Sequence, residues 1–105
     1  MSIFIKTERF KKETLDLMPK KRSQYIKEHL DWVSKLKEAG ENIASGYLVN
    51  EFSEAGGGGF LVVEANNFEE AKLLIINDPM IKNQLVTWEI HQWIPVLGQL
   101  LNQRG

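Results

Sequence analysis

A histidine and an aspartate are the two residues of this chain best suited to proton-transfer chemistry. His29 lies in a stretch with apolar residues at helical spacing, and on a helical wheel it falls inside the apolar stripe, between Tyr25 and Trp32. A histidine in that position is either a core residue with a satisfied hydrogen bond or the floor of a pocket. Imidazole transfers protons readily near neutral pH, so the second interpretation makes His29 a candidate acid–base residue.

Asp78 stands in Asn77-Asp78-Pro79, at the expected end of a second helix. A carboxylate there opposes the helix dipole, which favours cations at the C-terminal end. Asp before Pro commonly forms a turn, so Asp78 is either a turn former or the partner of a histidine. As a partner, its carboxylate would orient the imidazole ring and fix its tautomer.

Other kinds of site find little support in the sequence. The chain has no cysteine and only two histidines, so we expect neither a metal site nor a cofactor. We see no Ser-His-Asp signature, and Gly56–Gly59 matches no phosphate-binding motif, so these glycines are interpreted as a flexible hairpin tip. His91 alternates with Glu89 and Trp93 and is expected on the exposed or dimer-facing side of a strand.

The elements that must position these residues follow from hydrophobic periodicity and from proline and glycine positions. We predict a first strand at 3–5, a loop over 8–21 with a short helical turn around 13–18, and a helix from about 21 to 39. A hairpin is predicted over 42–65, a helix over 68–76 that begins with an Asn67 cap, and a strand over 85–94. The apolar tail over 96–101 is a candidate short helix.

The order β-α-β-β-α-β predicts an α+β, ferredoxin-like sandwich, with a four-stranded antiparallel sheet and two helices on one face. The second face of that sheet would carry large apolar groups such as Trp88 or Trp93. Stacking two sheets in a homodimer would cover it, so we expect a dimer through the open sheet face.

The length of the chain and its hydrophobic pattern limit the number of domains and the possibility of a membrane span. The chain of 105 residues is expected to form a single domain, 1–105, and no apolar run approaches the roughly 20 residues that span a bilayer. The N-terminus does not resemble a signal peptide, so we expect a cytoplasmic protein.

The net charge is −1, but ten of the thirteen Lys and Arg residues lie in residues 1–38. That basic third is a solvated face, attracts an anionic ligand, or supports self-association through complementary charge; we do not expect nucleic-acid binding.

Several short motifs together resemble the YCII-related (YciI-like) family. They are His29-Leu30-Asp31-Trp32 followed by Leu36 and Gly40, then Ser45-Gly46, a glycine-rich hairpin, Phe68-Glu69-Glu70-Ala71, Asp78-Pro79-Met80 and Trp93-Ile94-Pro95. The resemblance covers nearly the whole chain. It departs from the family in the long basic segment 8–21 and in Ile26, where the family often has a basic residue that Arg22, Lys21 or Lys27 would replace in space.

This resemblance implies a ferredoxin-like fold of the dimeric α/β-barrel group, with a cleft that holds His29 and Asp78. A few members are similar to lyase- or dehydrochlorinase-type enzymes that act on small hydroxylated aromatic rings. We therefore expect a cofactor-independent lyase or isomerase with His29 and Asp78 as the acid–base pair, and with Arg22, Trp32 and Ser45 in substrate binding. The alternative is a dimeric module that binds a small ligand without catalysis.

Overall fold

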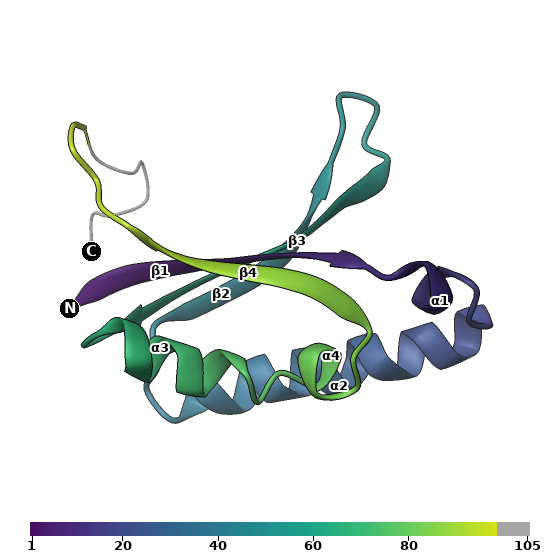
Figure 1. The fold of residues 1–105 in the computed structure, drawn as a ribbon, viewed down its shortest axis with the longest axis horizontal. Coiled ribbons are helices and arrows are strands. Elements are labelled where there is room, and N and C mark those ends of the chain that lie inside the picture. Colours follow the sequence, from purple (N-terminus) through teal and green to yellow (C-terminus); the bar gives the residue numbers. More distant parts are fainter. Residues whose placement is uncertain (99–105) are drawn as a thin grey trace.

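In the computed structural model, which describes residues 1–98, four strands form one antiparallel sheet and the helices lie against one of its faces (Figure 1). The elements in chain order are β1 (Ser2–Phe10), α1 (Lys12–Leu15), α2 (Pro19–Glu38), β2 (Ile43–Val49), β3 (Ala55–Ala65), α3 (Phe68–Ile75), α4 (Pro79–Lys82) and β4 (Val86–Trp93). The strands are ordered β2-β3-β1-β4. The predicted ferredoxin-like α+β architecture is confirmed. No helix within residues 1–98 is long and apolar enough to cross a bilayer.

The core lies between the sheet and the helices because the strands alternate in polarity. On β1 the buried side chains are Phe4 and Lys6, and they face the helices. Phe4 belongs to an apolar core with the buried residues Leu61, Val63, Ala65, Ala71 and Ile75, and Trp32, Trp88 and Ile90 pack against this core. A lysine among these apolar side chains is the feature that the rest of the site depends on.

The other face of the sheet carries no helix within the described residues (Figure 1). Ile3 of β1 pairs with Trp93 of β4, and Ile5 pairs with His91 of β4 and with Val62 of β3. These side chains alternate with the core residues and therefore point to the open face. His91 is exposed there, as its strand pattern predicts.

The segment 8–21 is more regular than the loop that we predicted, and its short helix α1 overlaps the helical turn expected around 13–18. Strand β1 continues to Phe10, which pairs with Val86 of β4, and Thr14 of α1 donates a hydrogen bond to the carbonyl of Leu85 at 2.7 Å. Pro19 is the first residue of α2, because proline needs no hydrogen-bond partner for its nitrogen in the first turn. The many charged residues of this segment favoured the prediction of a loop, because the polarity of side chains does not show which backbone groups are paired.

The glycine segment is also not the hairpin tip. Gly56–Gly59 belong to β3, and Gly59 pairs with Glu8 of β1, whereas the turn of the hairpin lies over residues 50–54. The β2–β3 hairpin extends beyond the rest of the sheet (Figure 1). A glycine-rich strand is a site where other groups approach the backbone closely, and that is its role here.

The second helical segment follows the prediction more closely. Asn67 caps α3, and its side chain accepts a hydrogen bond from the backbone nitrogen of Glu70 at 2.8 Å. After α3 the chain makes the short helix α4, which begins at Pro79. Beyond β4, residues 96–98 form no helix; the rest of the predicted tail helix, residues 99–101, lies outside the described residues.

Candidate functional site

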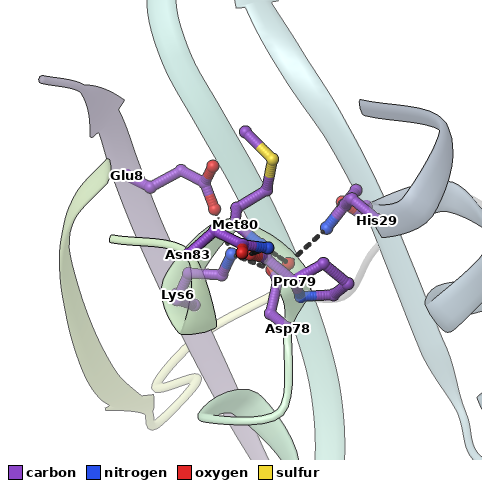
Figure 2. A network of polar contacts seen from close by, with 8 residues as sticks. Lys6, Glu8, His29, Asp78, Pro79, Met80 and Asn83 are labelled. Atoms are coloured by element: carbon purple, nitrogen blue, oxygen red, sulfur yellow. Dashed lines mark hydrogen bonds and ion pairs between the residues drawn. The ribbon is translucent and has the colours of Figure 1, made fainter. Parts of the chain in front are cut away.

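Asp78 is the centre of a buried polar cluster that joins the sheet to the helices. Its carboxylate is fully buried. Oδ1 accepts hydrogen bonds from His29 Nδ1 at 2.8 Å and from the backbone nitrogen of Met80 at 2.9 Å. Oδ2 accepts from Lys6 Nζ at 2.8 Å. Both interpretations of Asp78 are therefore correct at once, because the carboxylate caps α4 and also binds the histidine (Figure 2).

Lys6 brings a positive charge into the core. Its side chain is 1% exposed, and its ammonium donates to Asp78 and also to Glu8 Oε1. Glu8 lies two residues further along β1, on the same face, so the alternation of the strand delivers both charges to the helix side. Two carboxylates thus share one buried ammonium (Figure 2).

His29 connects this cluster to a second strand. Its ring is 12% exposed, and Nε2 lies 2.8 Å from Ser45 Oγ on β2. Because the ionised carboxylate of Asp78 only accepts, Nδ1 of His29 carries the donated hydrogen. In the neutral ring Nε2 is then the lone-pair nitrogen, and it accepts from the Ser45 hydroxyl. The chain Asp78–His29–Ser45 has the hydrogen-bond order of a catalytic triad, which the linear sequence did not indicate.

Competing effects set the protonation of Asp78. Burial by itself would raise the pKa of this carboxyl group. The hydrogen bond from His29 and the charge of Lys6 outweigh burial, so the pKa lies below its ordinary value of 3.8. Asp78 is therefore ionised at neutral pH and can hold His29 in one tautomer.

A cavity of about 560 Å³ opens beside this cluster. That volume suits a small organic ligand. Its polar side chains include Glu8, Arg9, His29 and Ser45. The apolar wall is formed by Phe10, Leu15, Ile26, Leu30, Phe60 and Met80, and the backbone of Gly56, Gly58 and Gly59 lines it as well. The cavity therefore places an acid–base group at an apolar surface.

The structure brings only some of the predicted site residues together. His29 and Asp78 are in contact, and Ser45 lines the cavity and contacts His29. Trp32 does not line the cavity; it packs on the core and lies beside the His29 ring, with centroids 5.8 Å apart. Arg22 is also away from the cavity, and Arg9 is the arginine that lines it.

Lys6 and Glu8 are the site residues that sequence reasoning missed. A signal for them exists: Phe4, Lys6 and Glu8 share the face of β1 that must pack on the helices, so two charges fall at core-facing positions. Such residues are rarely buried unless they are paired. Within the described part of the chain, no group of three or more His, Asp and Glu side chains is arranged to hold a metal ion.

Comparisons with known proteins agree with this fold. The sequence model of the YCII-related domain family matches residues 3–94. One solved structure with the same fold is 5-chloro-2-hydroxyhydroquinone dehydrochlorinase (TftG) from Burkholderia phenoliruptrix AC1100, in complex with 2,5-dihydroxybenzoquinone. It has a TM-score of 0.66 and 22% sequence identity, and the match covers 88% of this chain and 93% of that chain. Curated protein sequences give no significant match.

Replacing Lys6 with Met should destabilise the fold strongly, because it leaves the fully buried Asp78 carboxylate without its cation. Breaking a buried ion pair typically costs about 3–5 kcal/mol. Urea unfolding monitored by circular dichroism measures the loss. The matched control is Lys27→Met, which removes an exposed pair with Asp31 at 3.3 Å and should cost less than about 1 kcal/mol. Equal losses for the two variants would contradict this assignment.

The lowered pKa of Asp78 predicts a particular pH dependence of stability. Its ionised form contributes fully above pH 3.8, and this contribution is lost as pH falls from 3.8 toward the lower folded-state pKa. Asp78→Asn should therefore be less stable than the parent chain at about pH 7, and its stability should fall less steeply below about pH 4. Asp31→Asn, at an exposed position, should keep the parental slope. The slopes come from urea unfolding in a pH series; identical slopes for Asp78→Asn and the parent chain would refute the shift.

Proposed function

The chain belongs to the YCII-related family, and from this premise and the site geometry we propose that it is a small-molecule enzyme using general acid–base catalysis. His29 is the acid–base residue and Asp78 is the positioning residue behind it. The reaction class is proton transfer with elimination or isomerisation. The observation that carries the proposal is the hydrogen-bonded chain Asp78–His29–Ser45, in which His29 and Ser45 line the cavity and Asp78 is buried behind them.

The direction of proton flow follows from the hydrogen bonds. Nδ1–H of His29 is committed to Asp78, so Nε2 takes a proton from an acidic O–H or C–H group of the substrate. The imidazolium that forms is stabilised by the adjacent carboxylate. In an isomerisation the same proton returns to another atom of the substrate. In an elimination the electron pair of the broken substrate bond passes into a new double bond as the leaving group departs with its bonding pair, and the imidazolium then releases its proton to water.

Ser45 is bonded to the imidazole nitrogen that would take the substrate proton. Its hydroxyl lies 2.8 Å from Nε2, and both side chains line the cavity. A substrate proton therefore reaches Nε2 either after the substrate displaces this hydrogen bond or through the hydroxyl itself. Ser45→Ala separates the two routes. If the hydroxyl relays the proton, this variant should lose as much turnover as His29→Gln. If the substrate displaces the hydroxyl, the variant should lose far less.

The structural relative supplies the first compounds for an assay. That protein is named for the dehydrochlorination of a chlorinated hydroxyhydroquinone, a reaction that removes a proton and chloride. The cavity of this chain combines apolar walls with polar groups, as a small hydroxylated ring requires. We therefore propose small hydroxylated rings, with or without a halogen leaving group, as the substrate class.

His29→Gln should lower the turnover of a responsive compound by about 10²–10⁴-fold, the usual contribution of general acid–base catalysis. The assay follows chloride release from 5-chloro-2-hydroxyhydroquinone and absorbance changes for a panel of hydroxylated rings. Asp78→Asn should also lower kcat, because the ring loses its fixed tautomer. His91→Gln is the matched control: the second histidine lies on the other face of the sheet, outside the cavity, and glutamine keeps a polar side chain there, so turnover should stay parental.

Two outcomes would count against the enzyme. Parental turnover in His29→Gln would show that another group moves the proton. Saturable binding of the panel without conversion of any member would instead favour a ligand-binding module. Circular dichroism of each variant separates lost chemistry from lost folding.

We also propose that a second copy of the chain covers the open face of the sheet. Ile3, Ile5, Val62 and Trp93 lie on that face, and no helix of residues 1–98 covers it. A contiguous set of apolar side chains on an uncovered sheet face commonly marks a protein–protein interface. A twofold axis through the face would place equivalent strands of the two copies against each other.

Ile5→Glu should convert such a dimer into a monomer, since the side chain lies between its partners Val62 and His91 near the middle of the open face. Sedimentation velocity gives the mass directly. Leu73→Glu is the control, because Leu73 is 60% exposed on α3 in the helix layer and its replacement should leave the dimer intact. A monomeric parent chain, or a dimeric Ile5→Glu variant, would rule out this interface.

A further inference from the structure

Glu8 is a cavity-lining carboxylate that the proposed proton transfer does not use. Its side chain is 11% exposed, and Oε1 accepts from Lys6. Within residues 1–98 no side-chain or backbone donor is bonded to Oε2. One oxygen of the carboxylate is thus fixed by a buried ammonium, and the other has acceptor capacity left at the cavity wall.

Glu8 lies against two residues of β3 that are both glycine and therefore have no side chain to collide with it. Gly59 pairs with Glu8, and a Cβ atom at Gly59 would lie 2.8 Å from Glu8 Cγ and 3.4 Å from Oε2. Gly58 has φ of +95°, and a Cβ there would collide with the carbonyl oxygen of Glu8. Both glycines also line the cavity. The glycine segment therefore keeps the Glu8 carboxylate at the cavity wall.

The chemistry of this position selects the group that it can bind. A carboxylate oxygen is an acceptor, and in a mostly apolar cavity it must receive a hydrogen bond from water or from a ligand. Lys6 is shared with Asp78, so the two carboxylates outnumber the ammonium between them. An anionic substituent placed beside Glu8 would be repelled, whereas a hydroxyl group would be held by a charge-assisted hydrogen bond.

Glu8 and His29 flank Asp78 in Figure 2 and come from different elements, β1 and α2. We propose that Glu8 is a specificity-determining residue that binds a hydroxyl group of the substrate through Oε2, while His29 handles a second hydroxyl group. The ligand class is a small ring with at least two hydroxyl groups. The role of Glu8 rests on its own geometry; the pairing with a second group at His29 rests on the proposed function.

The test measures dissociation constants of the full-length chain for two probes, hydroquinone and its dimethyl ether, which share the ring and both oxygens but carry either donor hydrogens or methyl groups on them. Isothermal titration or amide chemical shifts give the constants. The parent chain should bind hydroquinone at least about tenfold more tightly, as expected for a hydrogen bond to a charged acceptor. In Glu8→Gln this preference should fall about tenfold, because the amide oxygen engages Lys6 and the amide group then offers a donor.

Two further variants keep the test decisive. Gly59→Ala should reduce the preference in the same way, since it displaces the carboxylate without removing it. Glu89→Gln, on the exposed side of β4, should leave both constants unchanged. Circular dichroism confirms that each variant is folded, and Gly59→Ala alone decides the test if Glu8→Gln does not fold.

The outcomes separate this proposal from the proposed function. A preference that survives in Glu8→Gln and Gly59→Ala overturns the role of Glu8, and so does a parent chain that binds both probes equally or binds neither. If His29→Gln keeps the full preference while Glu8→Gln loses it, the hydroxyl site at Glu8 stands and the pairing with His29 fails. A preference for hydroquinone that is lost only in His29→Gln assigns hydroxyl binding to His29 and overturns the role of Glu8.

Discussion

The buried ion pair between Lys6 and Asp78 is the constraint from which the rest of the site follows. Both side chains are at most 1% exposed, so neither charge can be hydrated by bulk water. Their mutual attraction compensates for this loss only if the remaining polar atoms are also bonded. His29, the backbone of Met80 and Glu8 provide those bonds. The need to satisfy one buried carboxylate therefore fixes groups from β1, α2 and α4 at a single point.

The same requirement explains why a cavity persists beside α2. The helix has 20 residues, none of them fully buried, and its apolar residues Ile26 and Leu30 are partly exposed at the cavity instead of packed in the core. Closer packing of the helix on the sheet would press apolar side chains onto His29, Ser45 and Glu8. Polar groups resist burial without partners, so α2 contacts this part of the sheet through the hydrogen bonds of His29, near its middle, and the space beside them remains open.

The sequence was most informative where the relevant pattern is local. The helical wheel placed His29 on the inner face of α2, and the Asp-Pro dipeptide placed Asp78 at a turn, because both depend on residues a few positions apart. The pairing of strands over long sequence distances is not visible in this way. Gly56–Gly59 looked like a tip because nothing local reveals that Gly59 pairs with Glu8, 51 positions earlier in the numbering. Arg22 looked suitable for an anion only because its place relative to the cavity was unknown.

Lys6 and Glu8 show a different limit, since their signal was present. The alternation of β1 places both charges on the face with Phe4, and a strand with charges on its core face is either misassigned or built around a polar site. In the structure β1 is correctly assigned as a strand and is built around a polar site. Because Asp78 lies between Lys6 and His29, a change at either neighbour reaches the other through this carboxylate. The residues that stabilise the fold and the residues proposed for chemistry therefore form one cluster, so variants at the site must be judged by stability and by function together.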